Sequence, residues 1–250
     1  MPVISDSTFK VEKQDLLSLP REISRRIFRK VVWPSPKLYA VCCLFRQMRP
    51  LIEYGDYDVW VGGFPRSSNT YTMTILEEAF SLHGRVAHRL HFPPHVIHAL
   101  RSCKPGFFLI RKPLDAIISW AQFNDFPLEH CINAYIDTHL ILLPYVDTLH
   151  IVQFDSVVND AKGLIEFCAT VANLSVAEKS IDYESIFKKI EDRWTDRDGN
   201  IIENRVARPS KLRAAQKPEL LNQIQSNPAY QKKLEKCEQL YAVFLSKKSF

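Results

Sequence analysis

The sequence predicts an α/β fold with three layers, in which a parallel sheet carries helices on both faces. The 250 residues are enough for one domain to bury a large core without disulfides or structural metals. From residue 56 to about 175, short apolar runs alternate with helical patterns, which indicates parallel strands joined by crossover helices. We therefore expect a single α/β domain over residues 56–250, with helical extensions at both ends, the N-terminal one over residues 1–55.

The N-terminal extension contains a basic amphipathic segment over residues 21–32. Its apolar side chains are Ile23, Ile27, Phe28, Val31 and Val32, interleaved with arginines and Lys30. We expect this helix to pack on the core with a solvated basic face. The alternative is a weak contact with a membrane surface through residues 21–32.

The individual elements follow from apolar patterning and from the few Gly and Pro residues that interrupt it. The expected strands span residues 57–62, 85–90, 106–110 and 150–154. The expected helices span about 70–82, 95–102, 114–123, 128–142 and 160–172. Residues 176–250 are expected to be mainly helical, with a last helix that starts at Pro228 and docks through Leu234, Leu240, Tyr241 and Phe244.

Charge and cysteine content narrow the functional classes. The 33 Lys and Arg exceed the 28 Asp and Glu by only 5, which is too mild for a duplex-binding surface but suits a cleft for a small polyanion. The six cysteines show no C-x-x-C pair, so we expect buried free thiols. No signal peptide and no apolar stretch of membrane-spanning length is visible, so we expect a cytoplasmic location.

The first expected strand runs directly into a polar loop over residues 63–70, followed by a helix. This placement is typical of a phosphate-binding loop, so the expected sheet is of P-loop type. In nucleotide-hydrolysing proteins the loop ends Gly-Lys-Ser/Thr, whereas here those positions hold Ser68, Asn69 and Thr70. The missing lysine argues against an ordinary kinase, and Arg66 supplies a cation earlier in the loop.

This loop resembles the 5′-phosphosulfate loop of sulfotransferases that use 3′-phosphoadenosine 5′-phosphosulfate (PAPS), whose pattern is aromatic-Pro-Lys-Ser-Gly-Thr-Thr-aromatic. The chain reads Phe64-Pro65-Arg66-Ser67-Ser68-Asn69-Thr70-Tyr71. Arg66 replaces the lysine, Ser68 the glycine and Asn69 a threonine. The resemblance implies that Arg66, Ser67, Ser68, Asn69 and Thr70 bind the 5′ end of PAPS.

A second motif of the same family follows the third expected strand. Sulfotransferases carry Arg-x-Pro-x-Asp-x-x-x-Ser there, and this chain reads Arg111-Lys112-Pro113-Leu114-Asp115-Ala116-Ile117-Ile118-Ser119. Ser119 falls two turns into the helix that Pro113 opens, on the face shared with Asp115. The resemblance implies that Arg111 and Ser119 bind the 3′-phosphate of the cofactor.

The segment Arg89-Leu90-His91-Phe92-Pro93-Pro94, at the end of the second expected strand, is similar to the family's Lys-Thr-His-Leu-Pro segment. The resemblance implies that His91 is the catalytic base, with Arg89 in the lysine's place and Arg66 as a further catalytic cation. A purely structural His91 is the alternative, in which case Glu78 is the second candidate base.

The basic segment over residues 205–213 lies where the family's C-terminal loop closes over the cofactor. Within it, Arg208 and Lys211 are the expected cofactor contacts, and a solvated charge run is the alternative. No metal site is expected.

The resemblance implies a sulfotransferase that moves a sulfuryl group from PAPS to a hydroxyl or amine of a small-molecule or glycan acceptor, with PAP as product. We expect no nucleic-acid partner. Two alternatives remain: a sulfotransferase-like nucleotide-binding protein without turnover, and a nucleotide-dependent kinase with a degenerate P-loop.

Overall fold

The computed structural model describes residues 22–46, 56–177, 181–192 and 211–250. Within them a parallel sheet of four strands has the order β2-β1-β3-β4. The strands are β1 (Val59–Gly63), β2 (Val86–Leu90), β3 (Gly106–Ile110) and β4 (His150–Gln153). The predicted α/β class with a parallel sheet is confirmed. The last residues of the chain run beside β4, where the Ser249 and Phe250 amides both donate to the Ile151 carbonyl.

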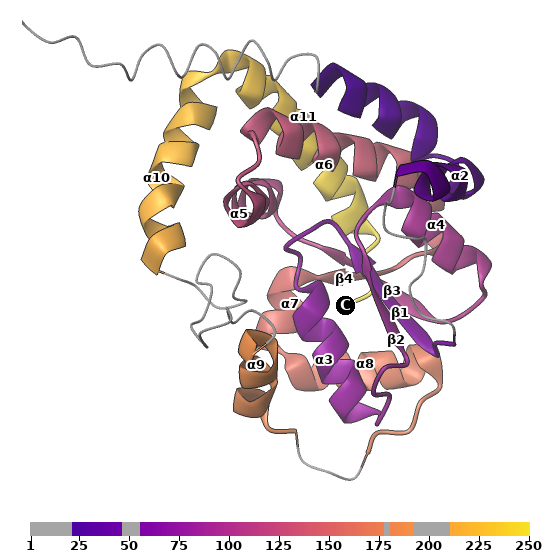
Figure 1. Ribbon diagram of the computed structural model, residues 1–250. Helices are drawn as coiled ribbons and strands as arrows, with labels where there is room; N and C mark the ends of the chain where they lie inside the picture. The colour runs from indigo at the N-terminus through magenta and orange to yellow at the C-terminus, as the bar shows by residue number, and fades with distance from the viewer. Residues whose placement is uncertain (1–21, 47–55, 178–180, 193–210) are drawn as a thin grey trace, which may run out of the picture.

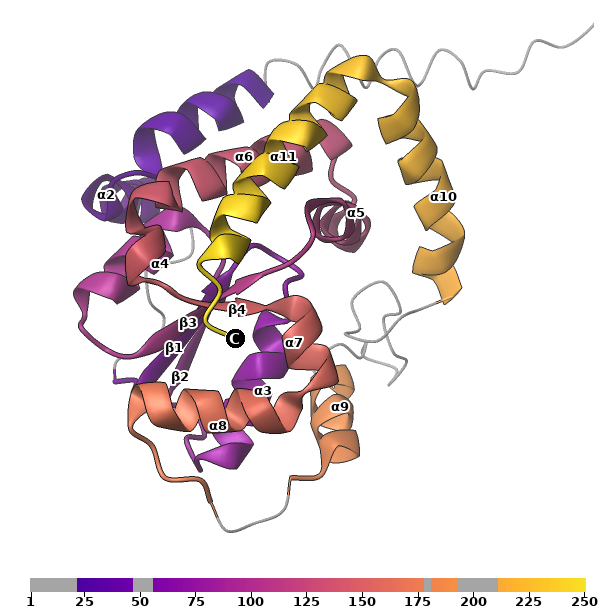
Figure 2. The same ribbon diagram turned by 180° about the vertical axis from the view of Figure 1, so that it is seen from behind.

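Helices cover both faces of the sheet (Figures 1 and 2). One face packs against α3 (Asn69–Ala79), α8 (Ala161–Ala172) and α9 (Tyr183–Asp192). The other packs against α4 (Pro93–Arg101), the short helix η1 (Leu143–Thr148) and α11 (Pro228–Ser246). Burial on both sides explains why the strands read as continuous apolar runs: Phe107, Phe108, Leu109 and Ile110 of β3 are all buried.

A further apolar cluster joins α2 (Pro36–Arg46), α5 (Pro113–Asn124), α6 (Leu128–Leu142) and α10 (Lys211–Ser226) with α11. The short helix α7 (Phe154–Asn159) links β4 to α8. The predicted docking of the last helix is confirmed, since Leu240, Tyr241 and Phe244 are buried and Leu234 is partly buried.

Most element boundaries differ from the prediction by one or two residues, and two of these differences have identifiable reasons. We expected the helix after β2 to begin at residue 95, but α4 begins at Pro93 because prolines are tolerated in the first helical positions, where the N–H is not needed. We expected the first crossover helix to reach residue 82, but α3 ends at Ala79, and Ser81 adopts a positive φ of 54° that ends helical geometry.

The helix over residues 22–32 is rotated away from its predicted orientation. Phe28 and Val32 face the core as expected, but Ile23, Ile27 and Val31 are exposed. Arg29, predicted on the solvated face, is only 2% exposed. Its guanidinium is held by Glu22 and Asp137, which fixes the side of the helix that faces inward.

All six thiols are free, and Cys131, Cys168 and Cys237 are buried. The expectation of burial is wrong for Cys103, which is exposed. Among the residues that the structure describes, no helix is long and apolar enough to cross a membrane.

Candidate functional site

The loop between β1 and α3 has a tightly constrained backbone. Gly63 has a φ of 150°, and a Cβ there would lie 2.5 Å from the Leu109 carbonyl oxygen, so only glycine fits. Arg66 and Ser68 both adopt left-handed conformations, with φ values of 69° and 77°. The side-chain amide of Asn69 donates to the carbonyls of Gly63 and Phe64, at 3.4 and 3.2 Å. Asn69 therefore holds the start of the loop against the start of α3.

Three buried side-chain oxygens gather in this loop and the first turn of α3. They are Ser67 Oγ, Asn69 Oδ1 and Thr72 Oγ1, and none has a hydrogen-bond partner among the described residues. An unsatisfied buried polar atom costs about 1–3 kcal/mol, so such atoms cluster where a ligand or water completes the site. In the strand order β2-β1-β3-β4, the chain leaves β1 toward one edge of the sheet and leaves β3 toward the other edge. The loop lies at the carboxyl end of β1 beside this switch point, which is the usual ligand position in an open parallel sheet.

The two predicted cofactor motifs touch each other. Arg66 Nε donates to Ser119 Oγ at 3.1 Å, and an Arg111 guanidinium nitrogen donates to the Arg66 carbonyl at 2.8 Å. The Arg66 guanidinium also lies over the Phe123 ring and that of Arg111 over the Phe154 ring, at 4.7 and 4.2 Å from the ring centroids. The fold thus brings Arg66, Arg111 and Ser119 together.

A third guanidinium comes from α10. The Arg213 carbonyl accepts a hydrogen bond from the Gln122 side chain of α5 at 2.7 Å, which places the first turn of α10 beside α5. Burial, together with the positive charges of Arg213 and Arg111, lowers the pKa of Arg66 to about 9. Burial also lowers the pKa of Arg111, against the opposing influence of Asp115.

Arg66, Arg111 and Arg213 therefore repel one another at a partly buried place, where charge interactions are poorly screened. A bound anion offsets this repulsion and forms charge-assisted hydrogen bonds with the guanidinium groups. The arrangement is suited to holding a phosphate or sulfate group between the loop after β1 and the end of β3.

Arg89 and His91 lie at a bulge that ends β2. The pairing of β1 with β2 shifts between Trp60 and Gly62, and Arg89 takes a positive φ of 64°. His91 Nδ1 lies 3.2 Å from the Gly63 carbonyl oxygen. Because a carbonyl only accepts, Nδ1 is the protonated nitrogen in this hydrogen bond, and Nε2 of the neutral ring is the acceptor.

The remaining predicted site residues have less specific surroundings. Ser68 precedes α3 as its N-cap but makes no capping hydrogen bond through its side chain, and the Thr70 carbonyl accepts from Thr74 Oγ1. Lys211 is exposed at the first position of α10, and Arg208 lies outside the described residues. Sequence reasoning placed Arg213 in the basic segment without choosing it, because no motif spacing singled it out.

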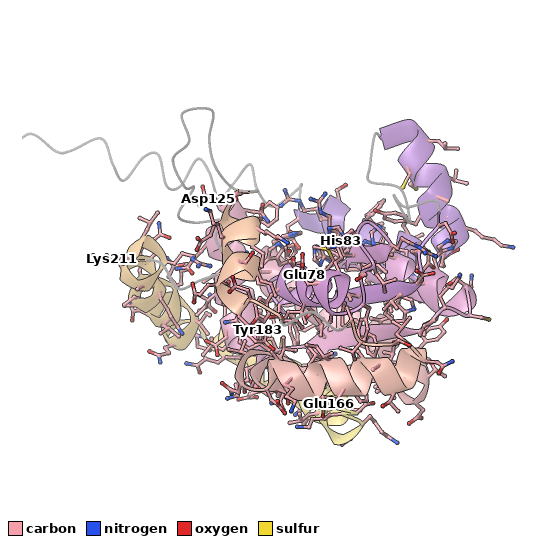
Figure 3. All side chains as sticks on the ribbon, turned by 90° about the horizontal axis from the view of Figure 1, so that it is seen from below. Glu78, His83, Asp125, Glu166, Tyr183 and Lys211 are labelled. Atoms are coloured by element: carbon pink, nitrogen blue, oxygen red, sulfur yellow. The ribbon has the colours of Figure 1, made fainter. Side chains whose placement is uncertain are left out.

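Glu78, the second candidate base, lies near the end of α3, whereas the phosphate loop precedes the start of that helix. It pairs with Lys189 of α9. Figure 3 shows Glu78 on α3 and Lys211 at the edge of the molecule on α10. The structure therefore does not bring Glu78 to the loop.

Within the described part of the chain, no group of three or more His, Cys, Asp or Glu side chains could hold a metal ion. No known family model, curated protein or solved structure matches the chain significantly.

Proposed function

We propose that this protein binds PAPS and transfers its sulfuryl group to a hydroxyl or amine of an acceptor. The observation that carries the proposal is the contact between Arg66 and Ser119, which joins the loop expected at the 5′ end of the nucleotide to the segment expected at its 3′-phosphate. Arg111, bonded to the Arg66 carbonyl, belongs to the same cluster.

The residues present fit a nucleotide with an anionic group at each end. The unpartnered Ser67 hydroxyl and the backbone N–H groups at the start of α3 suit the 5′ end. Arg111 and Ser119 suit the 3′-phosphate, and Arg213 adds positive charge from α10. PAPS supplies a sulfuryl group already attached to a phosphate leaving group, so the protein mainly positions it and stabilises charge.

His91 and Arg66 would have the two main chemical roles. His91 Nε2 takes the proton from the acceptor hydroxyl or amine as the bond from acceptor to sulfur forms and the bond from sulfur to the bridging phosphate oxygen breaks. The guanidinium of Arg66 stabilises the negative charge left on that phosphate oxygen. Arg89, next to His91 at the end of β2, is the second cation available there.

A kinase-like function is less well supported by the loop geometry. The position that carries lysine in nucleotide-hydrolysing loops is Asn69, and its amide is already bonded to two carbonyls of the same loop. Asn69 therefore stabilises the loop and offers no cation to a terminal phosphate.

The test compares the binding of PAP, AMP and ATP by calorimetry. PAP should bind about 10- to 100-fold more tightly than AMP, because hydrogen bonds from a guanidinium to a phosphate contribute about 1.5–3 kcal/mol. Arg111→Ala should remove most of this preference, whereas Arg66→Ala should weaken both ligands. Arg101→Ala, at an exposed position of α4, is the matched control and should change neither.

Turnover with PAPS and a panel of hydroxyl and amine acceptors then distinguishes an enzyme from a nucleotide-binding protein. Equal binding of PAP and AMP by the unmodified protein, or tighter binding of ATP than of PAP, would contradict the proposal. PAP binding without transfer to any acceptor would support the binding-protein alternative instead.

A further inference from the structure

The helix over residues 22–32 and α2 expose two rows of aliphatic side chains. We refer to these six residues as the aliphatic surface: Ile23, Ile27 and Val31 on the first helix, and Leu38, Val41 and Leu44 on α2. Spacings of four and three residues place each row on one face of its helix. The exposed fraction reaches 59% at Ile27 and 82% at Leu44, which is unusual for large aliphatic side chains gathered on two consecutive helices.

A buried ionic cluster fixes the orientation of the first row. Arg29 donates to Asp137 at 2.8 Å and to Glu22 at 2.7 Å, and His130 Nδ1 lies 3.1 Å from the second Glu22 oxygen. Asp137 and His130 belong to α6, so these bonds attach the helix to the core. If the helix turned so that Ile27 faced inward, Arg29 would lose its bonds to Glu22 and Asp137. Breaking such pairs of buried charges is strongly destabilising.

The charge around the aliphatic surface is predominantly positive. Residues 23–46 contain Arg25, Arg26, Arg29, Lys30, Lys37 and Arg46, and no Asp or Glu. Glu22, directly before this stretch, neutralises Arg29 together with Asp137 and also pairs with Arg25 at 3.9 Å. Arg25, Arg26, Lys30 and Lys37 are exposed. In a helical-wheel projection of the first helix, Lys30 and Arg26 lie directly beside the row of Ile23 and Ile27, on one side of it.

We propose that the aliphatic surface docks on an anionic phospholipid bilayer. Aliphatic rows flanked by Arg and Lys are the pattern by which amphipathic helices lie in the plane of such a membrane. The two helices lie on the outside of α6 and α4, away from the sheet (Figures 1 and 2). A second copy of the chain is a poorer occupant, because a symmetric contact would bring the cations of both copies together.

The proposal goes beyond the proposed function and does not depend on it, since none of the surface residues belongs to the nucleotide site. Flotation of the full chain with vesicles tests it directly. The chain should float with vesicles of phosphatidylcholine and phosphatidylserine but not with phosphatidylcholine alone, and added salt should weaken the association.

Variants on the aliphatic surface distinguish the contribution of its aliphatic side chains from that of the neighbouring positive charges. Ile27→Asp should reduce vesicle binding about tenfold or more, because it removes a central aliphatic contact and places a negative charge against anionic lipid. Arg26→Glu combined with Lys30→Glu should abolish binding. Val158→Asp on α7 replaces an equally exposed aliphatic residue elsewhere and should bind as the unmodified chain does. Thermal unfolding verifies that each variant is folded.

Failure to bind the anionic vesicles, or equal binding by Ile27→Asp and the unmodified chain, would overturn the proposal. A dimer in sedimentation velocity that Ile27→Asp dissociates would also overturn it, since the occupant of the surface would then be a second copy. PAP binding by Ile27→Asp should stay unchanged, so this test succeeds or fails separately from that of the nucleotide site.

Discussion

Ser68 occupies a backbone conformation that glycine adopts without strain. Its φ of 77° and ψ of 10° lie in the left-handed region, where the Cβ of an ordinary residue costs about 1–2 kcal/mol. The sulfotransferase pattern has glycine at this position. In this chain a serine takes the left-handed conformation that glycine adopts without strain.

Ser68→Gly should therefore raise the free energy of unfolding by about 0.5–1 kcal/mol, the relief of strain less the entropy that glycine gains in the unfolded chain. Urea unfolding measures this, and calorimetry should find PAP affinity unchanged or improved. Ser185→Gly, within helix α9, is the control and should lower stability by about 0.5 kcal/mol. A loss of stability in Ser68→Gly would show that the hydroxyl, rather than the backbone, determines this position.

His91→Ala tests the assignment of the general base. We expect turnover to fall by about two to four orders of magnitude, the usual effect of removing such a group, while PAP binding stays near normal. The motivation is the Nδ1 hydrogen bond to the Gly63 carbonyl, which leaves Nε2 as the acceptor nitrogen. His83→Ala, at an exposed position, should keep full activity. Near-normal turnover of His91→Ala across neutral pH would assign the role to another group.

Among the helices, α6 contains a histidine enclosed by aromatic rings. His139 donates from Nδ1 to the Tyr135 carbonyl at 2.8 Å, stacks on the Tyr135 ring at 4.0 Å and meets the edge of Phe244 at 5.0 Å. Burial lowers its pKa from 6.5 to about 4, although the hydrogen bond acts in the opposite direction. The neutral ring is therefore the form that this packing accepts.

His139 should make folding stability fall as the pH falls from about 6.5 to 4. In this window the unfolded chain binds a proton that the folded chain does not, so acid favours unfolding, by about 3 kcal/mol at the lower end. His139→Phe removes the titration while keeping an aromatic ring. Urea unfolding at pH 7 and pH 4.5 should show a smaller difference for this variant than for the unmodified protein. An identical difference would mean that His139 contributes nothing to acid sensitivity.

The bounds of an element can be predicted from its local sequence pattern, but an orientation that depends on a residue far away in the sequence cannot. The strand over residues 106–110 was predicted with its observed bounds, because burial on both faces leaves a continuous apolar run between Pro105 and Arg111. The orientation of the helix over residues 22–32 could not be predicted in this way. Its inward face is selected by Arg29, whose partner Asp137 is 108 positions away. Local periodicity contains no information about that pair.

On the scale of the whole molecule, the candidate site gathers residues from four separate segments. Arg66, Arg111 and Ser119 were predicted because two motifs have fixed spacings and parallel strands end at one edge of the sheet. Arg213 was not selected, because no motif spacing singles it out within the basic segment. It reaches the site through the Gln122 contact, which spans 91 positions of sequence.

Helix α10 is the part of the molecule whose stability should respond most to the nucleotide. Of its described residues only Ile224 is buried, Pro218 interrupts its hydrogen bonding, and its first half meets α5 through the Gln122 contact and an ion pair of Lys217 with Asp115 at 3.0 Å. We expect a helix with so little burial to open more often than the core helices, and a ligand held by Arg213 to make each opening more costly. The first half of α10 should therefore open less often when phosphate binds.

Hydrogen exchange with and without PAP tests this coupling between α10 and the nucleotide site. Amides in the first half of α10 should exchange about 10- to 100-fold more slowly at a saturating PAP concentration, because each opening then breaks the contact between Arg213 and the ligand, which contributes about 1.5–3 kcal/mol. Amide exchange through local opening of helix α8, which packs on the sheet face with α3 and α9, should slow much less. In Arg213→Ala the slowing in α10 should largely disappear while PAP still binds, since Arg66 and Arg111 remain. Unchanged exchange in α10 of the unmodified protein would leave that helix a solvated surface element with no part in holding the nucleotide.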